Sequence, residues 1–424
     1  MQRRCARPSW QRKATAKRGL GLTFCLLFAA GASPARAVLW DGGGTTSEWI
    51  EPANWQFNLV PTTADIATIV NDTATISGRT VPTVKAVELG MGSLPGSLMI
   101  SGGVNPGGLH VVTSVVVAAA GDLTLGGGGP ASSQLTANAL TTAGTVAVLS
   151  QGVVDLTGQL TQTAGMLNLN GGSLSVAAVS VQAGAFNASG NVGGNVTIGD
   201  GGGATAILAP KQVVEINGDL ELASDARLEV AFRSGVFDQL EVSGTATLGG
   251  VLDLSFLGTA PPAPGSRYPI LTASALKGAF TDIVGTNVGG GSWIPDFDIT
   301  NGINVFYTEL PGNMNGDDAV DELDVELFAH AIRDPNTYHV DFFLAGDVAD
   351  SFMADMDGDG SNTFADIPPF LEAVEFFGGS SDAALAAITQ VLSVPEPSSA
   401  TIVLAAAFIS SIFGRSPRSR GRRG

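Results

Sequence analysis

The sequence predicts a mainly β protein: a parallel β-solenoid, or β-helix, with a small closing β subdomain, followed by a small α-helical module. Two observations predict the β body. Between residues 38 and 308, short alternating apolar runs are separated by Gly, Asn and Asp, and a turn that ends in glycine recurs about every 20 residues. The module is predicted by two acidic loops in one register after residue 312, each followed by a helical apolar pattern.

Residues 1–37 are typical of a secretory signal peptide. Seven basic residues precede an apolar run at 20–32, and Ala35-Arg36-Ala37 has the small-x-small pattern that signal peptidase cuts. We therefore expect the exported chain to begin after Ala37. The alternative is a buried N-terminal helix. Both cysteines, Cys5 and Cys25, lie in this segment, so the exported chain would have neither a thiol nor a disulfide.

The repeat is clearest within residues 38–239, which we expect to form the solenoid. Alternating strands follow turns that end at Gly121, Gly144, Gly165 and Gly184. These glycines recur at intervals of about 20 residues, a period that suits one coil of a solenoid stacked on the next. Leu167 and Leu169 would then share the inner face of a strand. The competing interpretation is a β-sandwich built from hairpins.

Three tryptophans, Trp40, Trp49 and Trp55, cluster at the start of the body. We expect their rings to cover the open edge of the first coil, which otherwise invites aggregation. The alternative is a platform on which sugars stack. This opening resembles the start of bacterial secreted β-solenoid and autotransporter-like proteins. Residues 240–308 carry longer strands between Pro- and Gly-rich turns and are expected to form the closing β subdomain.

The charges of the chain are unevenly distributed. Of the 21 basic residues, 8 lie in residues 1–36 and 5 in 415–423, so that 8 basic residues face all 39 acidic residues between 38 and 397, a net charge of −31. Binding to nucleic acid needs a basic surface, and we therefore expect no nucleic-acid partner. The scarcity of cations and aromatic residues between 97 and 223 also argues against a polysaccharide lyase or hydrolase site on the solenoid.

Residues 309–397 contain 19 of the 39 acidic residues and a single cation, Arg333. Within them, loop one (residues 313–324) and loop two (residues 355–366) have the ligand spacing of a calcium loop. The expected ligands of loop one are Asn313, Asn315, Asp317, the carbonyl of Ala319, Asp321 and Asp324. Those of loop two are Asp355, Asp357, Asp359, Ser361, Thr363 and Asp366. We expect two Ca²⁺ ions, bound more tightly at loop two because Asp318 replaces the turn glycine in loop one; the alternative is a pair of solvated acidic turns.

The tandem loop–helix units resemble type I dockerins, which are EF-hand-like, and resemble still more closely the dockerin-like modules of secreted planctomycete proteins. The resemblance covers residues 312–377, and we expect the whole module to span residues 309–380. It implies a calcium-dependent docking module whose partner is a cohesin-like or other surface protein. The recognition positions here are Glu322, Leu323, Phe364 and Ala365 instead of the Ser-Thr pairs of cellulosomal dockerins, so the identity of the partner does not transfer.

The C-terminal end has three parts. Residues 381–397 are expected to be a linker that ends in Pro395-Glu396-Pro397, and residues 398–424 contain an apolar run and an Arg-rich tail. This order resembles the PEP-CTERM sorting signal of bacterial surface proteins, which implies processing near Pro395, Glu396 and Pro397 by an exosortase-like enzyme. The alternative is a plain transmembrane anchor with a cytoplasmic basic tail.

Together these features predict an exported, non-catalytic protein of the cell surface or extracellular matrix. Its module would dock or stabilise the chain in a calcium-dependent manner. The alternative is a carbohydrate-active protein, one that degrades or binds a polysaccharide and is delivered by the dockerin-like module.

Overall fold

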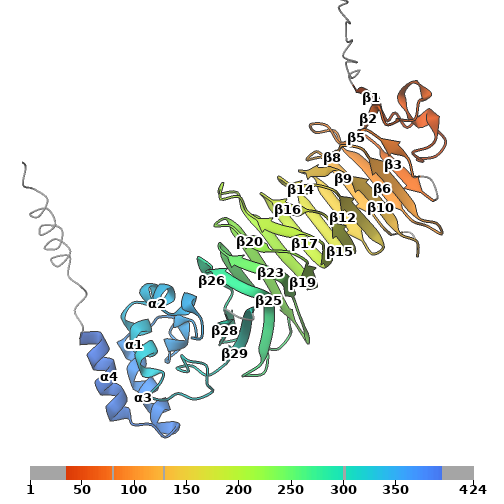
Figure 1. The fold of residues 1–424 in the computed structure, drawn as a ribbon. Coiled ribbons are helices and arrows are strands. Elements are labelled where there is room, and N and C mark those ends of the chain that lie inside the picture. Colours follow the sequence, from red (N-terminus) through yellow and green to blue (C-terminus); the bar gives the residue numbers. More distant parts are fainter. Residues whose placement is uncertain (1–34, 79–80, 128, 299–301, 394–424) are drawn as a thin grey trace, which may run out of the picture. The chain divides into compact units, whose positions relative to one another are not determined.

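The computed structural model describes residues 35–393, apart from 79–80, 128 and 299–301. This part of the chain is mainly β, and most of its strands join parallel neighbours in a β-helix-like repeat, with small helices after residue 324 (Figure 1). The predicted parallel repeat is confirmed. The alternative of a β-sandwich is wrong, because the strand pairs of the body run parallel instead of forming hairpins.

Three parallel ladders run through the body, and each coil contributes to all three. The first ladder contains β1 (Arg36–Leu39), β2 (Asp65–Ile69), β5 (Ala86–Leu89), β8 (Ser114–Val117), β11 (Ala139–Thr142), β14 (Gln159–Gln162), β16 (Ala178–Val181), β18 (Asn195–Ile198) and β20 (Leu220–Leu222).

The second ladder contains β3 (Thr73–Ser77), β6 (Gly96–Ser101), β9 (Gly121–Leu125), β12 (Thr145–Leu149), β15 (Met166–Ser175), β17 (Gly184–Val192), β19 (Ala206–Ile216), β21 (Ala226–Arg233), β24 (Val251–Phe256) and β26 (Asp282–Val284). The third begins with β4 (Thr83–Val84), β7 (Gly107–Val111), β10 (Ser133–Ala137) and β13 (Gly152–Leu156). It continues through the second halves of β15, β17 and β19.

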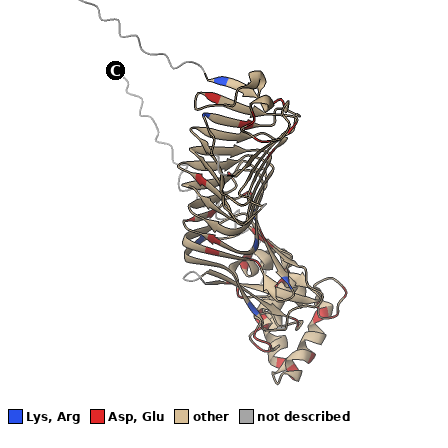
Figure 2. Ribbon diagram, turned by 90° about the vertical axis from the view of Figure 1, so that its right-hand side faces the viewer, with Lys and Arg blue, Asp and Glu red and all other residues tan. Residues whose placement is uncertain are grey.

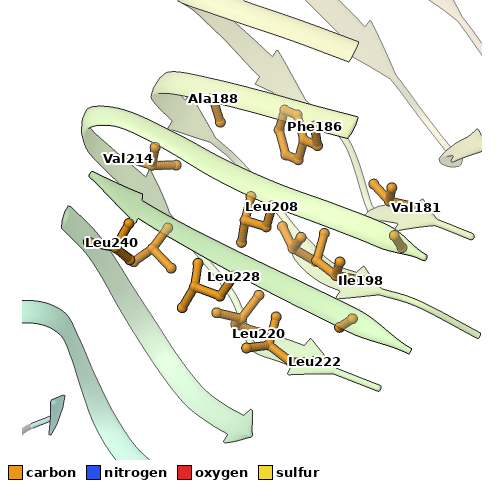
Figure 3. Packing of buried hydrophobic residues seen from close by; sticks show 14 of the residues in the cluster. Val181, Phe186, Ala188, Ile198, Leu208, Val214, Leu220, Leu222, Leu228 and Leu240 are labelled. Carbon is orange, nitrogen blue, oxygen red and sulfur yellow. The ribbon is translucent and has the colours of Figure 1, made fainter. Parts of the chain in front are cut away.

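The interior of the body is filled by parallel stacks of apolar side chains, and each coil contributes one side chain to each stack. The register places Leu98, Leu123, Val146, Leu167 and Phe186 at one position of successive coils. All are buried, as is Leu169, so the predicted inner face is confirmed. Figure 3 shows the continuation of the stack through Leu208 and Leu228.

The turn glycines lie where neighbouring coils approach most closely. Gly165 has a φ of +73°, and a Cβ atom there would lie 2.2 Å from the carbonyl oxygen of Gly144 in the preceding coil. Only glycine combines this backbone conformation with so short an approach. The glycine spacing seen in the sequence therefore has a direct structural cause.

The three N-terminal tryptophans pack together inside the protein beside the short helices η1 (Pro52–Asn54) and η2 (Gln56–Asn58). Each is at most 2 % exposed, and the Trp55 ring meets those of Trp40 and Trp49 edge to face at 5.0 and 4.7 Å between centroids. The indole N–H of Trp55 donates to the carbonyl of Trp49 at 2.7 Å. The alternative of a sugar-stacking platform is therefore wrong, because the faces of these rings are not accessible.

The parallel body extends beyond the predicted boundary at residue 239. Parallel pairing continues through β23 (Gln239–Leu248), β24 and β26, and through the greater part of β25 (Arg267–Gly278). The boundary predicted at residue 239 is wrong, because the repeat still runs regularly from Leu228 to its register partner Leu252. The period lengthens only in the next coil, between Leu252 and its register partner Ile283. Apart from two isolated bridges, Trp40 with Trp55 and Met91 with Leu94, antiparallel pairing within the described residues is confined to β22 (Val236–Phe237) with β21, and to β25, β27 (Asn287–Val288), β28 (Gly291–Asp298) and β29 (Gly302–Thr308).

The helical module contains α1 (Val325–Arg333), α2 (Pro335–Asp341), α3 (Ile367–Phe376) and α4 (Ser381–Ser393), with the short helices η3 (Phe343–Ala345), η4 (Ser351–Ala354) and η5 (Phe364–Asp366). The expected linker over 381–397 is wrong for residues 381–393, which form α4. Ala and Leu favour the helix, the hydroxyl of Ser380 accepts from the Ala383 N–H at 3.3 Å, and Ala384 and Ile388 are buried.

Candidate metal centre

Loop two brings three carboxylates together. Oxygen atoms of Asp355, Asp357 and Asp359 lie within 4.8 Å of one another; Asp357 and Asp359 are exposed and Asp355 is half-buried. Figure 2 shows further acidic positions on the helical module that carries this loop. Carboxylate oxygens at alternating loop positions are the hard donors that Ca²⁺ prefers, so the donor set fits this ion.

Backbone N–H groups hold the first carboxylate of loop two in place. Oδ1 of Asp355 accepts from the N–H groups of Gly358 and Asp359 at 2.9 and 3.1 Å, and its Oδ2 accepts from Gly360 at 2.8 Å. The loop therefore folds around the Asp355 side chain by local hydrogen bonds. Gly360 makes the turn with a φ of +88°, a conformation that L side chains rarely adopt.

Asp366, the last residue of loop two, closes the loop from inside. Its side chain is fully buried; Oδ1 accepts from the N–H groups of Met356 and Asp357 at 2.8 and 3.1 Å, and Oδ2 accepts from Thr363 at 2.7 Å. The Thr363 hydroxyl in turn accepts from the Ala365 N–H at 3.1 Å, at the start of η5. In this structure Asp366 and Thr363 stabilise the loop backbone, a role that the ligand pattern in the sequence did not reveal.

Loop one has the same backbone frame. Asp324 is fully buried; its Oδ1 accepts from Met314 and Asn315 at 2.7 and 2.9 Å, and its Oδ2 accepts from Asp321 at 2.9 Å. These donors occupy the second, third and ninth loop positions, as they do in loop two. The common register predicted from the sequence is therefore confirmed as a shared geometry of the two loops.

The side chains of loop one differ in charge from those of loop two. Asn313 and Asn315 present amide oxygens, both of which accept from the N–H of Asp317, at 3.1 and 3.0 Å. The carboxylate of Asp317 accepts from the Ala319 N–H at 3.1 Å, and that of Asp321 from the Leu323 N–H at 2.7 Å. Loop one thus offers fewer charged oxygens near its start.

Asp318 makes the turn of loop one with a φ of +68°. Aspartate tolerates this left-handed conformation better than most residues but less well than glycine. The backbone of loop one is therefore strained at Asp318, as the sequence predicts.

One carboxylate in each loop has a raised pKa. The hydrogen bond from the Asp359 N–H lowers the pKa of Asp357. Desolvation and the negative charges of Asp359, Asp366 and Asp355 raise this pKa, and together they outweigh the hydrogen bond, so that the net shift is upward. Burial raises the pKa of Asp324 to about 6, against the opposing effect of its backbone hydrogen bonds. Like-charge repulsion of the kind that acts on Asp357 is relieved when a cation binds between the carboxylates.

A ring contact joins the two loop–helix units. Phe328 in α1 and Phe370 in α3 stack with centroids 3.8 Å apart and an angle of 8° between the rings. Each belongs to the helix that follows its loop and occupies the same position relative to that loop. Asn362 of loop two adds a second connection, since its side-chain amide donates to the carbonyl of Ala331 in α1 at 3.4 Å. The two units therefore form one module with internal repetition.

The expected processing sites are described only in part. Ala37 lies in β1, next to Arg36, whose Nε donates to Asp65 at 3.0 Å. Pro395, Glu396 and Pro397, with the apolar run after them, lie outside the described residues. Among residues 35–393, no described helix is long and apolar enough to cross a membrane.

Comparison with known proteins adds no relative. No family model matches the chain, and neither a curated protein nor a solved structure is similar to it.

Proposed function

We propose that the chain is an exported, non-catalytic protein of the cell surface or extracellular matrix, with a calcium-binding module at its C-terminal end. The observation that carries this proposal is the pair of loops with one backbone frame, of which loop two gathers Asp355, Asp357 and Asp359. Asp355, Asp357 and Asp359 would hold the ion at loop two, and Asn313, Asn315 and Asp317 would hold a weaker one at loop one.

The body would act as a scaffold. Its interior is a continuous apolar cluster, and we therefore expect the body to fold without a metal ion or a disulfide. A groove of about 230 Å³ on its surface is lined by Glu215 and Glu241 from neighbouring coils, but the rest of its lining is aliphatic, amide or hydroxyl side chains. A glycan site is expected to add aromatic rings for stacking, so this groove does not favour the carbohydrate-active alternative.

Export and sorting make up the second part of the proposal. Signal peptidase would cut after Ala37, an exosortase-like enzyme would act near Pro395-Glu396-Pro397, and a cohesin-like or other surface protein would be the docking partner. The support for these steps is the sequence of the two ends together with the acidic module between them.

The test of export is the intact mass of the chain from each cell fraction. We expect an envelope or extracellular form that lacks residues 1–37 and the Arg-rich tail. The variant Glu396→Ala should retain the tail, whereas the control Asp382→Ala should lose it as the wild type does. A full-length chain in the cytoplasm would contradict the proposed export, and a tail retained by a membrane-bound wild type would favour a plain anchor.

A further inference from the structure

Loop one lies directly against the last hairpin of the body, β28–β29. Gly316, the fourth residue of the loop, has a φ of +71°, and a Cβ atom there would lie 2.5 Å from the Phe306 ring and 2.6 Å from Cδ1 of Ile294. Ile294 and Phe306 are paired residues of β28 and β29. The backbone of loop one therefore touches the hairpin so closely that only glycine fits.

Hydrogen bonds attach the start of loop one to the same hairpin. The side-chain amide of Asn313 donates to Oγ1 of Thr308, the last residue of β29, at 3.3 Å, and both residues are buried. Because its NH₂ group faces Thr308, the Oδ1 atom of Asn313 faces the loop, where it accepts from Asp317. One side chain thus connects the strand to the interior of loop one.

The segment between the two loops adds further attachments to the body. The N–H of Asp347 donates to the carbonyl of Pro295 in β28 at 2.7 Å, and the Thr286 hydroxyl donates to Asp350 at 2.7 Å. The same segment is also bonded to loop one, because the N–H of Ala349 donates to the carbonyl of Met314 at 2.8 Å. Loop one is therefore held between the hairpin and a segment that is itself bonded to the hairpin.

Loop two has no such contact at its equivalent position. Gly358 is also the fourth residue of its loop and has a φ of +73°, but a Cβ atom there would meet nothing within 4 Å among the described residues. The neighbouring carboxylates of Asp357 and Asp359 are exposed. The two loops share a backbone frame and differ in what surrounds it.

We propose that loop one couples cation binding to the order of the β28–β29 hairpin, and hence to the end of the parallel body, whereas loop two acts only within the helical module. This inference rests on the proposed calcium function. A cation at loop one would draw the oxygens of Asn313, Asn315 and Asp317 together and fix Gly316, which lies between them, against Phe306. The module is then a metal-dependent cap of the body and not a freely tethered docking unit.

Hydrogen exchange of the full chain, read by mass spectrometry on peptides that cover β29, tests the coupling. At a calcium concentration ten times the dissociation constant of loop one, exchange in β29 should slow about tenfold relative to chelator. The matched variants are Asp317→Asn and Asp359→Asn, which remove one charge at the fifth position of each loop. Asp317→Asn should move the calcium midpoint for β29 to higher concentration, and Asp359→Asn should leave it unchanged.

A second pair of variants tests the contact itself. Gly316→Ala and Gly358→Ala introduce the same methyl group at the same loop position with nearly equal φ. Gly316→Ala should abolish the calcium-dependent slowing in β29, and Gly358→Ala should preserve it. The proposal would be overturned if the two glycine variants showed the same calcium-dependent slowing of exchange in β29. It would also be overturned if the exchange rate in β29 of the wild type did not depend on calcium although calorimetry shows two bound ions. Absence of any bound calcium would instead refute the proposed function.

Discussion

A charge placed inside one coil should unfold the body locally, and Leu169→Asp is the sharpest form of this test. Leu169 in β15 is fully buried and lies in register with Val148 and Ala188 of the two neighbouring coils. The adjacent residue, Asn170, is exposed. Asn170→Asp therefore introduces the same side chain one position along the strand but on the outer face, and it serves as the matched control.

The expected magnitude follows from burial. Removal of the leucine side chain from the interior loses about 2 kcal/mol of apolar burial. An unpaired carboxyl group in the same place adds at least about 3 kcal/mol, because no described donor stands opposite it in the stack. The sum of about 5 kcal/mol is comparable to the whole stability of an ordinary domain.

Urea unfolding followed by circular dichroism, together with hydrogen exchange in β12, β15 and β17, measures the effect. Local exchange is needed because a stacked repeat can open coil by coil and depart from two-state behaviour. We expect Leu169→Asp to expose these three strands and Asn170→Asp to match the wild type within about 0.5 kcal/mol. Equal midpoints for the two variants would show that Leu169 does not face a core and would refute the stacking.

Three further outcomes follow from the geometry. Trp55→Ala should lower the free energy of unfolding by about 3–5 kcal/mol, whereas Phe57→Ala, at a residue 75 % exposed, should change it little; thermal melts of both variants check this. Asp366→Ala should destabilise the module strongly even in chelator, because three backbone N–H groups lose a buried acceptor. Asp359→Ala removes one exposed acceptor, that of the Ser361 N–H, and should therefore cost much less in chelator than in calcium. Burial lowers the pKa of His330, so the unfolded chain takes up this proton first, and the contribution of His330 to stability should fall as the pH drops below about 6.5. The raised pKa of Asp324 acts in the opposite direction, so the measurement is the difference between the pH profiles of the wild type and His330→Gln, and no difference below pH 6.5 would contradict the prediction.

The local pattern of the sequence predicted the repeat well because the signals that set it are local. Glycine at a corner and alternation within a strand are visible over a few neighbouring positions, and Gly165 and Leu169 lie where these signals require. The loop register was visible for the same reason. It depends on a fixed spacing of oxygen-bearing side chains inside each loop.

The features that the sequence did not reveal depend on distant contacts. Nothing near Gly316 indicates that Phe306 and Ile294 approach its backbone, and the role of Asp366 as an acceptor for Met356 and Asp357 cannot be separated from a ligand role by spacing alone. The linker expected over residues 381–397 is wrong for residues 381–393. Their Ala-rich helix gains stability from burial against the module.

Calorimetric titration of the full chain with calcium shows whether the two loops are unequal calcium sites. We expect two binding events, with dissociation constants of roughly 10⁻⁴ to 10⁻³ M as in other extracellular modules. Asp355→Ala should abolish the tighter event and Asn313→Ala the weaker one. No heat of calcium binding in the millimolar range, or an equal loss in both variants, would contradict the account and leave the loops as acidic turns.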